Sequence, residues 1–330
     1  MELLAESPAG LQCYPGGLVI DPVAPVERAV ITHAHGDHAR AGSAAYLCHT
    51  DCEPLLRRRL GADARIQTLA YGERLRLGDG VTLSLHPAGH MLGSAQVRLE
   101  HASSGVWVCS GDYKREVDPT CPPFEPVRCE VFVTEATYAL PIFRWSDPGA
   151  VAEQIVSWWS GNADKASLLF CYALGKAQRL LAELARRTGR ACFIHGALEA
   201  PCDAYRAAGV KLLPTRPIGD EKRFAGELVL APITARGSPW MKRFGDFETA
   251  FASGLLRVRG TRRRRGFDRG FVISDHADWS SVLRTVEETG CARVMVGHGH
   301  REVLARYLRE VRGLDARALS LMREPDPEGD

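Results

Sequence analysis

The sequence lacks a long apolar run, a CxxC pair and a basic amino-terminal segment. No stretch approaches the roughly 18 to 20 apolar residues that a helix needs to span a bilayer. The first residues, MELLAESPAG, carry Glu2 and Glu6 where a secretory signal would carry positive charge. The ten cysteines are scattered along the chain. We therefore expect a cytoplasmic protein whose thiols are reduced and mostly buried.

The composition excludes a disordered or fibrous chain. Apolar residues make up 45% of the 330 residues and charged residues 25%, which is typical of one large globular domain or two ordinary ones. The net charge of +2 is unevenly distributed, because residues 257–270 (RVRGTRRRRGFDRG) place seven arginines against one acid, Asp268. Such a run is compatible with a solvated loop and with a surface that binds phosphate-rich partners.

The order of secondary structure predicts an α/β fold. The first 135 residues hold short β-rich runs, among them AVIT, VTLSLH, VWVCSG and VFVTE. From about Pro148 helical patterns alternate with single strands, which predicts a parallel sheet covered by helices. Histidines in motif-like settings occur before residue 120 and after residue 270. If one site gathers both groups, the block between them is an insertion.

The segment ITHAHGDH concentrates potential metal ligands behind the predicted strand AVIT. His33 and His35 can extend from the loop to one metal, while Asp37 and His38 follow Gly36 and can point at a second metal beside it. Imidazoles with a carboxylate suit zinc, and also manganese or iron, better than calcium or magnesium. The sequence therefore predicts a transition-metal site.

Two further candidate ligands follow other predicted strands. His90 lies in the glycine-flanked loop of HPAGHMLGSAQ, and Asp112 follows the strand end in CSGDY. His86 competes with His90, but it alternates with leucines in a strand, which favours a structural role. The segment CHTDC, residues 48–52, also holds metal-binding residue types but lacks the fourth ligand of a closed zinc site.

The pattern HxHxDH, with His90 and Asp112 downstream, resembles that of the metallo-β-lactamase superfamily. The resemblance implies a four-layered αββα sandwich with two metal ions, bridged by Asp112. Further along the chain, TEATY contains Glu135, SDHAD contains His276 and GHGH contains His298. These three resemble the motifs of the β-CASP nucleases, and His300 is the alternative to His298. The seven metal ligands so implied are His33, His35, Asp37, His38, His90, Asp112 and His298.

The resemblance extends over nearly the whole chain. YALGKAQRLL, RWS and SDHADW look like segments of the bacterial exonucleases associated with DNA ligases. The implied domains are the first part of a metallo-β-lactamase domain at 1–145, a β-CASP domain inserted at 146–265, and the second part of the metallo-β-lactamase domain at 266–330. The implied activity is a two-metal phosphodiesterase that trims DNA ends in repair, with 5′-to-3′ polarity and a functional link to a DNA ligase and a helicase.

The resemblance also assigns roles around the metals. It implies one metal on His33, His35 and His90, and a second on Asp37, His38 and His298, with Asp37 and Asp112 among the catalytic residues. His276 would contact the scissile phosphate or protonate the leaving oxygen, and Glu135 would orient His276 by hydrogen bonding.

Evidence for substrate binding in the sequence is indirect. Lys176 lies at a predicted helix start, where a phosphate could bind, although a tight turn with an exposed lysine explains it equally. Ser274 is a phosphate candidate by family analogy. Trp240 could stack on a base or pack between domains. The basic wall of a nucleic-acid cleft would be formed by Arg262, Arg263, Arg264 and Arg265.

Three alternative functions stay open. His298 is typical of RNA-cleaving members, so an RNA-processing β-CASP ribonuclease is the second hypothesis. A thioester or lactam hydrolase would share the signature of residues 33–38 but would have no use for the inserted block. A catalytically weak nucleic-acid-binding scaffold would usually have lost metal ligands, and this chain keeps all seven.

Overall fold

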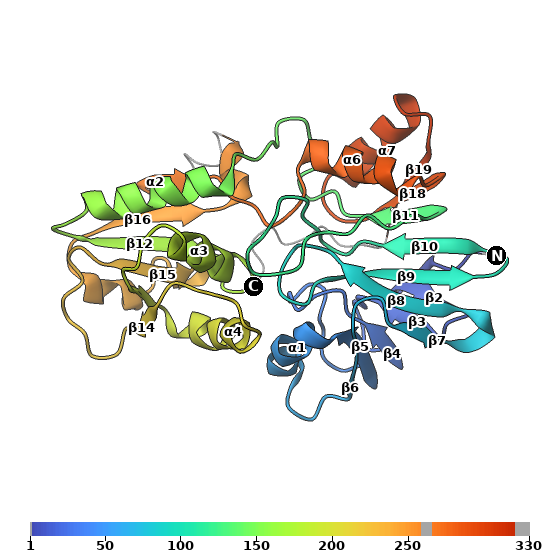
Figure 1. Cartoon of the computed structure of the whole chain (residues 1–330), viewed down its shortest axis with the longest axis horizontal. Coiled ribbons are helices and arrows are strands. Elements are labelled where there is room, and N and C mark those ends of the chain that lie inside the picture. The colour runs from blue at the N-terminus through green and yellow to red at the C-terminus, as the bar shows by residue number, and fades with distance from the viewer. Residues whose placement is uncertain (1, 259–265, 321–330) are drawn as a thin grey trace. The chain divides into compact units, whose positions relative to one another are not determined.

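The computed structural model describes residues 2–258 and 266–320, which divide into two compact units (Figure 1). The first unit is built from two separate stretches of chain, residues 2–141 and 276–320, and the second unit is the continuous stretch 142–275. Arg262 to Arg265, the predicted basic wall, lie outside the described residues.

One sheet of the first unit has the strand order β1-β2-β3-β4-β5-β6. The first three strands pair antiparallel, and β3 to β6 pair parallel. The strands are β1 (Ala5–Ser7), β2 (Gly10–Cys13), β3 (Leu18–Ile20), β4 (Arg28–Val30), β5 (Ala45–His49) and β6 (Ile66–Leu69). The predicted strand AVIT corresponds to β4 and the residues directly after it.

The second sheet has the order β19-β18-β11-β10-β9-β8-β7. Its strands β10, β11, β18 and β19 are parallel neighbours, so their carboxyl ends lie at one edge. The strands are β7 (Arg74–Arg76), β8 (Thr82–Pro87), β9 (Ala95–His101), β10 (Gly105–Cys109), β11 (Val131–Thr134), β18 (Arg293–Val296) and β19 (Asp315–Ala318).

The two sheets of the first unit share a core. Leu83 and Leu85 alternate along β8 and are fully buried with Val30 and Leu47 of the first sheet. The other face of the second sheet buries α6 (Trp279–Thr289) and α7 (Arg301–Glu310), which lie beside β18 and β11 in Figure 1. Near β5 and β6 lie η1 (Thr50–Cys52) and α1 (Glu53–Leu60), and η2 (Gly78–Gly80) precedes β8.

The second unit contains the parallel sheet that the alternating sequence predicted. Its order is β14-β13-β15-β12-β16-β17, and every pairing between these neighbours is parallel. The strands are β12 (Ala166–Cys171), β13 (Cys192–Ile194), β14 (Thr215–Pro217), β15 (Leu228–Pro232), β16 (Phe247–Ala252) and β17 (Arg269–Phe271). All six residues of β12 are buried, as expected of a central parallel strand.

The two faces of this parallel sheet are covered differently. One face packs on α2 (Pro148–Gly161), α3 (Lys176–Ala185) and α4 (Gly196–Ala207). The other face packs on short segments that include η3 (Ile233–Ala235), η4 (Pro239–Phe244) and η5 (Gly254–Arg257). The expected covering of helices is therefore correct for one face, whereas short 3₁₀ turns cover the other.

Two expectations from composition can be compared with the structure. The ten cysteines form no disulfide, and nine of them are buried, which confirms the expectation of mostly buried thiols. Among the residues that the structure describes, no helix is both long and apolar enough to cross a membrane.

Candidate metal centre

The candidate ligands follow the ends of strands in the first unit. Asp112, Glu135 and His298 come shortly after β10, β11 and β18. Because these strands are parallel neighbours, the residues that follow them emerge at the same edge of the second sheet. The topology therefore gathers side chains that are far apart in the sequence.

The first histidine loop begins directly after β4. The backbone N–H of Ile31 still donates to Leu47, but the N–H of Thr32 donates instead to the Asp21 carboxylate at 2.8 Å. The chain then turns, since the N–H groups of His38 and Ala39 both donate to the His35 carbonyl. This turn brings the three imidazole rings together, with the His33 centroid 4.7 Å from that of His35 and 4.1 Å from that of His38.

Three imidazoles converge on one point. The distance from His33 Nε2 to His35 Nδ1 is 3.1 Å, and from His90 Nε2 to the same atom it is 3.2 Å. These nitrogens and a carboxylate oxygen of Asp112 all lie within 4.8 Å of one another. Tetrahedral zinc with Zn–N bonds of about 2.0–2.1 Å would separate neighbouring nitrogens by about 3.3 Å. The donor types and their spacing therefore fit a divalent metal ion.

Asp112 lies between this group and the neighbouring side chains. Its Oδ2 atom is 3.6 Å from His33 Nε2, 3.4 Å from His38 Nε2 and 3.8 Å from His276 Nδ1. Asp112 is buried, so these separations place a carboxylate oxygen among three imidazoles away from bulk water. This position is compatible with a carboxylate shared by two metal ions.

Asp37, His38 and His298 form a second, looser group. The rings of His38 and His298 are stacked with centroids 5.0 Å apart, and His38 Nε2 is 3.7 Å from Asp37 Oδ2. Among the described residues, neither His38 Nε2 nor His298 Nδ1 has a hydrogen-bond partner, although both atoms are buried. Buried polar atoms are rarely left in this state. A second metal ion would satisfy these donor atoms.

Sequence reasoning missed Asp21, which orients two of the ligands. Asp21 Oδ2 accepts from the Thr32 hydroxyl at 2.6 Å and lies 2.7 Å from His38 Nδ1. Because the Thr32 hydroxyl donates to Asp21, it accepts from His33 Nδ1 at 3.0 Å. Both imidazoles therefore carry a proton on Nδ1, so their Nε2 atoms are the ones that face the site, as outer-shell carboxylates commonly arrange. The signal in the sequence was an aspartate ending a short apolar strand.

The His90 loop is held by a serine and by a close backbone approach. The N–H groups of His90 and Met91 both donate to Ser94 Oγ at 3.1 Å. Gly93 has a φ of 71°, and a Cβ atom there would collide with the backbone nitrogen of Cys52. A glycine is therefore required for the loop to bring His90 to the other histidines.

His298 adopts a backbone conformation that non-glycine residues seldom occupy. Its φ is 46°, and Gly299 follows with a φ of 64°. A Cβ at Gly299 would collide with the carbonyl of Ala136, which also accepts from the His300 N–H at 2.8 Å. The turn after β18 is thus packed onto the turn after β11, which fixes His298 in the left-handed region.

Glu135 and His276 form a hydrogen-bonded pair. Glu135 Oε2 lies 2.9 Å from His276 Nδ1, and Oε1 accepts from the backbone N–H of Tyr113 at 2.8 Å. Glu135 is almost fully buried, whereas about a fifth of the His276 side chain is exposed. The carboxylate therefore fixes the orientation of an imidazole that still reaches solvent.

The cluster shifts the proton affinities of its members in opposite directions. Burial, followed by repulsion from His38, His35 and His90, holds the pKa of His33 well below 6.5. Burial alone would also lower the pKa of His38, but nearby carboxylates, Asp112 foremost, raise it well above 6.5. Burial would raise the pKa of Asp112, yet the surrounding imidazoles hold it well below 3.8. The site therefore keeps Asp112 ionised and His33 neutral, which are the forms that bind metals.

Several other candidates lie apart from this cluster. His86 is near Ser84 and Glu125, as a structural role predicts. His49 accepts from the Asp51 N–H and caps η1, and no metal cluster of described residues includes residues 48–52. His300 precedes α7 as its N-cap residue and does not belong to that cluster either.

The two described residues that were predicted to bind substrate, Lys176 and Ser274, lie in the second unit. The alternative of an exposed Lys176 is wrong, because its side chain is buried and its Nζ atom lies 2.8 Å from Asp275 Oδ2. Ser274 is also buried. Trp240 packs edge-on against His195 and Phe244 within this unit. The phosphate and stacking roles stay predictions.

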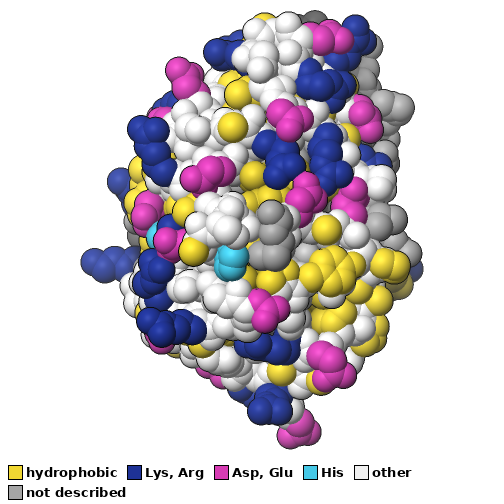
Figure 2. All heavy atoms as spheres, turned by 90° about the vertical axis from the view of Figure 1, so that its right-hand side faces the viewer, with side chains coloured by type: hydrophobic (Ala, Val, Ile, Leu, Met, Phe, Trp, Pro, Cys, Tyr) yellow, Lys and Arg dark blue, Asp and Glu magenta, His cyan; other side chains and the backbone are white. Residues whose placement is uncertain are grey.

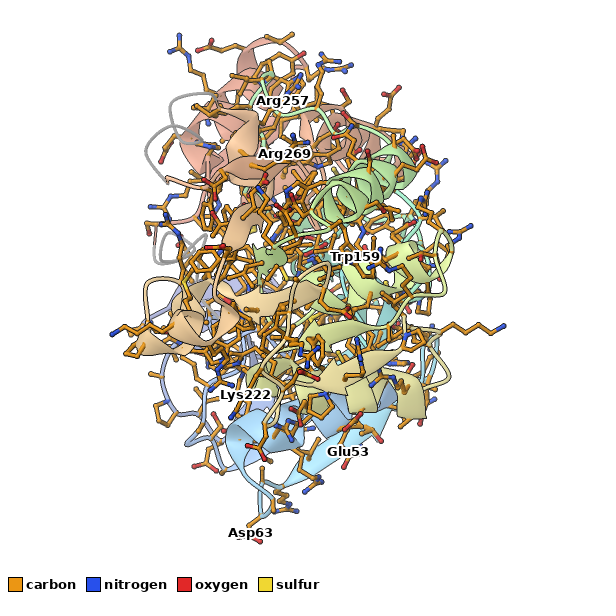
Figure 3. The ribbon with its side chains drawn as sticks, turned by 90° about the vertical axis from the view of Figure 1, so that its left-hand side faces the viewer. Glu53, Asp63, Trp159, Lys222, Arg257 and Arg269 are labelled. Carbon is orange, nitrogen blue, oxygen red and sulfur yellow. The ribbon has the colours of Figure 1, made fainter. Side chains whose placement is uncertain are left out.

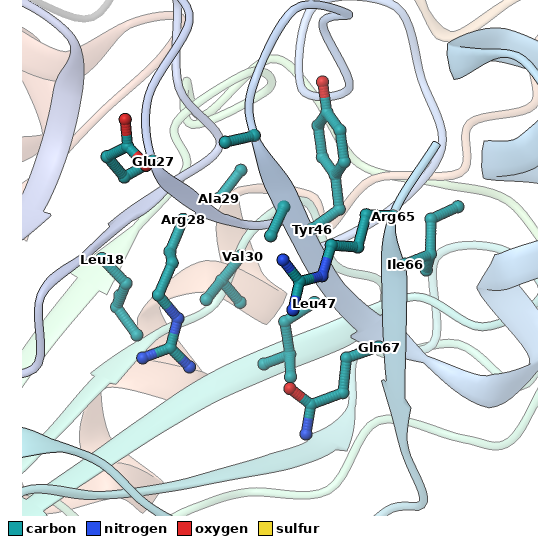
Figure 4. A pocket seen from close by; sticks show the side chains of 12 residues that line it. Leu18, Glu27, Arg28, Ala29, Val30, Tyr46, Leu47, Arg65, Ile66 and Gln67 are labelled. Carbon is teal, nitrogen blue, oxygen red and sulfur yellow. The ribbon is translucent and has the colours of Figure 1, made fainter. Parts of the chain in front are cut away.

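Surface charge can be followed in the figures. Arg257 and Arg269 are exposed and flank residues 259–265 in the sequence (Figure 3). On the face shown in Figure 2, the described side chains mix both signs of charge. A pocket of about 480 Å³ lies among β3 to β6, lined by Arg28, Arg65 and ten other residues (Figure 4). None of these lining residues is a predicted ligand, so this pocket is separate from the donor cluster.

Comparisons with known proteins give one long match and one short one. No family model matches the chain. Over 305 residues, 92% of its length, the chain is 32% identical to a probable DNA ligase of Opitutus terrae, and it covers 30% of that protein. Over 106 residues, 31% of its length, it is 33% identical to the endoribonuclease YSH1 of Gibberella zeae, of which it covers 12%.

A solved structure of a protein of unknown function from Enterococcus faecalis V583 shares the fold. It superposes with a TM-score of 0.55 over 82% of this chain and 74% of that chain, at 11% sequence identity. At this identity the likeness concerns the fold alone. The chain spans less than a third of the length of the first curated relative that it matches. The two sequence matches are consistent with a metallo-β-lactamase-like nuclease.

Proposed function

We propose that the chain is a two-metal-dependent phosphodiesterase, a DNA exonuclease that trims DNA ends in repair with 5′-to-3′ polarity. The observation that carries the proposal is the convergence of His33, His35 and His90 on Asp112, beside the buried and unsatisfied nitrogens of His38 and His298. The long match to a protein named as a probable DNA ligase supports a nucleic-acid substrate.

The proposal includes a fold assignment. Residues 1–145 and 266–330 would form a metallo-β-lactamase domain with αββα layers, and residues 146–265 would form an inserted β-CASP domain. The separation of the chain into a discontinuous and a continuous unit supports an insertion. An inserted α/β unit also argues against a thioester or lactam hydrolase, because the metal-ligand unit alone would suffice for such small substrates.

The seven candidate ligands divide between two metal ions. His33, His35 and His90 would hold one, Asp37, His38 and His298 would hold the other, and Asp112 would contact both. Zinc or manganese fits these donors, and iron is a third possibility. When bound, the two ions would supply Lewis-acid stabilisation of the charge on the phosphodiester.

The chain itself would position the substrate and move a proton. Glu135 holds the proton on His276 Nδ1, so His276 Nε2 is the atom that would contact the scissile phosphate or deliver a proton to the leaving oxygen. Asp37 and Asp112 are the proposed catalytic carboxylates, which would hold the metal ions. Asp21 would keep His33 and His38 in the tautomer that leaves their Nε2 atoms available.

Substrate binding is the least constrained part of the proposal. The arginines at 262–265 would contact the phosphate backbone, and Arg257 and Arg269 on either side are exposed. Lys176 would contact a phosphate only if its ammonium group exchanged Asp275 for that phosphate, and Ser274 is a phosphate candidate by family analogy. A functional link to a DNA ligase and a helicase belongs to the same proposal.

RNA processing is the second candidate function. The specific observation in its favour is His298, which stacks on His38 and supplies a buried nitrogen to the site. The short match to a protein named as an endoribonuclease supports the same reading. A non-catalytic scaffold has less support, because the donor atoms of a metal site are all retained.

Cleavage of end-labelled nucleic acids tests the proposal directly. Single-stranded and double-stranded DNA and matched RNA would be incubated with added manganese or zinc, with Asp112→Ala as the blank. Stepwise shortening of DNA, dependent on Asp112, is the expected result, and labels at either end report polarity. Preferential loss of RNA would instead establish the second candidate, and absence of metal-dependent cleavage of any substrate would contradict both.

A further inference from the structure

Helix α3 carries charged side chains on its buried face. Lys176, Arg179 and Glu183 follow one another at intervals of three or four residues and therefore share one side of the helix. Lys176 is 3% exposed and Arg179 is 1% exposed. Buried charges are costly unless they are paired, and even paired ones add little net stability. Their partners therefore indicate what these charges are retained for.

The partners of the first two cations lie in one short segment. Lys176 Nζ is 2.8 Å from Asp275 Oδ2, and Arg179 Nη1 is 3.2 Å from Asp275 Oδ1. The Arg179 guanidinium also donates to the backbone carbonyl of Ser274. Both carboxylate oxygens of Asp275 and the preceding backbone are thus held by α3, in a region that excludes water.

His276 is the next residue along the chain. A trans peptide places consecutive Cα atoms about 3.8 Å apart, so an anchored Asp275 limits where His276 can lie. On the other side of His276, the N–H of Ala277 donates to the Tyr113 carbonyl at 2.7 Å, and Asp278 caps α6 by accepting from the Ser281 N–H at 2.8 Å. The backbone is therefore fixed within one residue on both sides of His276.

We propose that Lys176 and Arg179 are positioning residues, which act through Asp275 and Ser274 to hold His276 in the place where it contacts the substrate. The inference rests on the proposed function, because it assigns these residues to the step that His276 performs. Fixing a register is the best-attested use of buried charge pairs. A misplacement of about 1 Å at a reacting group can cost about a hundredfold in rate.

This role explains Lys176 without a bound phosphate. Its ammonium group is buried against a carboxylate, which is an arrangement for holding a chain segment rather than for capturing an anion from solvent.

The test compares Lys176→Met and Asp275→Asn with Glu183→Gln. The control removes a buried carboxylate from the same helix that is ion-paired with Arg187, and its electrostatic effect on Arg179 is smaller than that of Asp275. We expect the first two variants to lower kcat by about tenfold to a hundredfold with KM within about twofold of wild type and metal content unchanged. Glu183→Gln should leave kcat within about twofold, and Lys176→Arg, which keeps the charge, should recover most of the loss.

Two further measurements separate positioning from general damage. In a His276→Ala background, adding Lys176→Met should cause no further fall in kcat, because the group being positioned is already gone. Hydrogen exchange of the amides at 273–279 should accelerate in Lys176→Met and Asp275→Asn and stay unchanged in Glu183→Gln. Thermal denaturation identifies any variant that does not fold, and Lys176→Met retains Arg179 as a second anchor.

Additive losses with His276→Ala, or equal losses of kcat in Glu183→Gln, would overturn the inference. If the wild-type protein cleaved no nucleic acid, the proposed function would fail, and the exchange measurement would still decide whether the contacts of α3 hold the segment around His276. Unchanged exchange in Asp275→Asn would refute the positioning role independently of any activity.

Discussion

Replacing Asp21 by asparagine tests how the donor cluster is organised. Three donors converge on the two carboxylate oxygens: the Thr32 N–H on Oδ1, and the Thr32 hydroxyl and His38 Nδ1 on Oδ2. Asparagine has nearly the same shape but only one acceptor oxygen. Its NH₂ group must therefore face at least one of these buried donors.

The size of the effect follows from these contacts. If the amide oxygen replaces Oδ2, the Thr32 N–H loses its acceptor, and an unsatisfied buried donor costs about 1–3 kcal/mol. If the oxygen replaces Oδ1, the NH₂ group donates to His38 Nδ1 and drives the imidazole proton to Nε2, the atom that faces Asp112. Loss of such an outer-shell contact typically lowers metal affinity by about 10- to 100-fold.

The assay uses urea unfolding of the metal-free protein and competition with a chelator for the metal. We expect Asp21→Asn to lose about 1–3 kcal/mol of unfolding free energy, to bind metal about 10- to 100-fold more weakly, or both. Asp51→Asn is the matched control, because its carboxylate is partly exposed and 3.8 Å from His49. A change below about 0.5 kcal/mol together with unaltered metal affinity would refute the argument.

Three further predictions concern single side chains. His35→Ala or Asp112→Ala should abolish hydrolysis while substrate binding persists, as gel-shift and cleavage assays would report, and retained turnover in both would contradict a two-metal site. His276→Ala should slow cleavage by about 10²- to 10⁴-fold without loss of metal by elemental analysis, and an empty site in that variant would contradict its place outside the ligand set. Burial raises the pKa of Cys192 from 9.0 to about 12. The unfolded chain therefore releases this proton first, and the unfolding free energy should fall by up to about 1.4 kcal/mol per pH unit between pH 9 and 12, a slope that Cys192→Ala should reduce.

The candidate ligands were accessible from sequence because they lie in short, dense motifs. His33, His35 and His38 are separated by a few residues, and one turn after β4 brings them together. The strand β12 and the helix α3 could also be predicted, because the spacing of apolar residues changes there from that of a strand to that of a helix. Local patterns therefore predicted the elements and the most compact part of the site.

Contacts between distant segments could not be predicted from local sequence patterns. Asp21 ends an ordinary apolar strand, and only the parallel pairing of β3 with β4 brings it to Thr32 and His38. The partner of Lys176 could not be predicted from the sequence either. A lysine at a helix start suggests solvent or an anion, and nothing nearby in the sequence reveals that Asp275 is its partner.

The discontinuity of the first unit has a consequence for biosynthesis. Strand β11 takes β18 as its neighbour, with Val131 opposite Arg293, so the ribosome must make the whole second unit before this edge of the sheet can close. At typical translation rates the interval lasts on the order of ten seconds. During that time β11 presents an unpaired, apolar edge that another nascent chain could join. We expect chains that stop before β18 to aggregate.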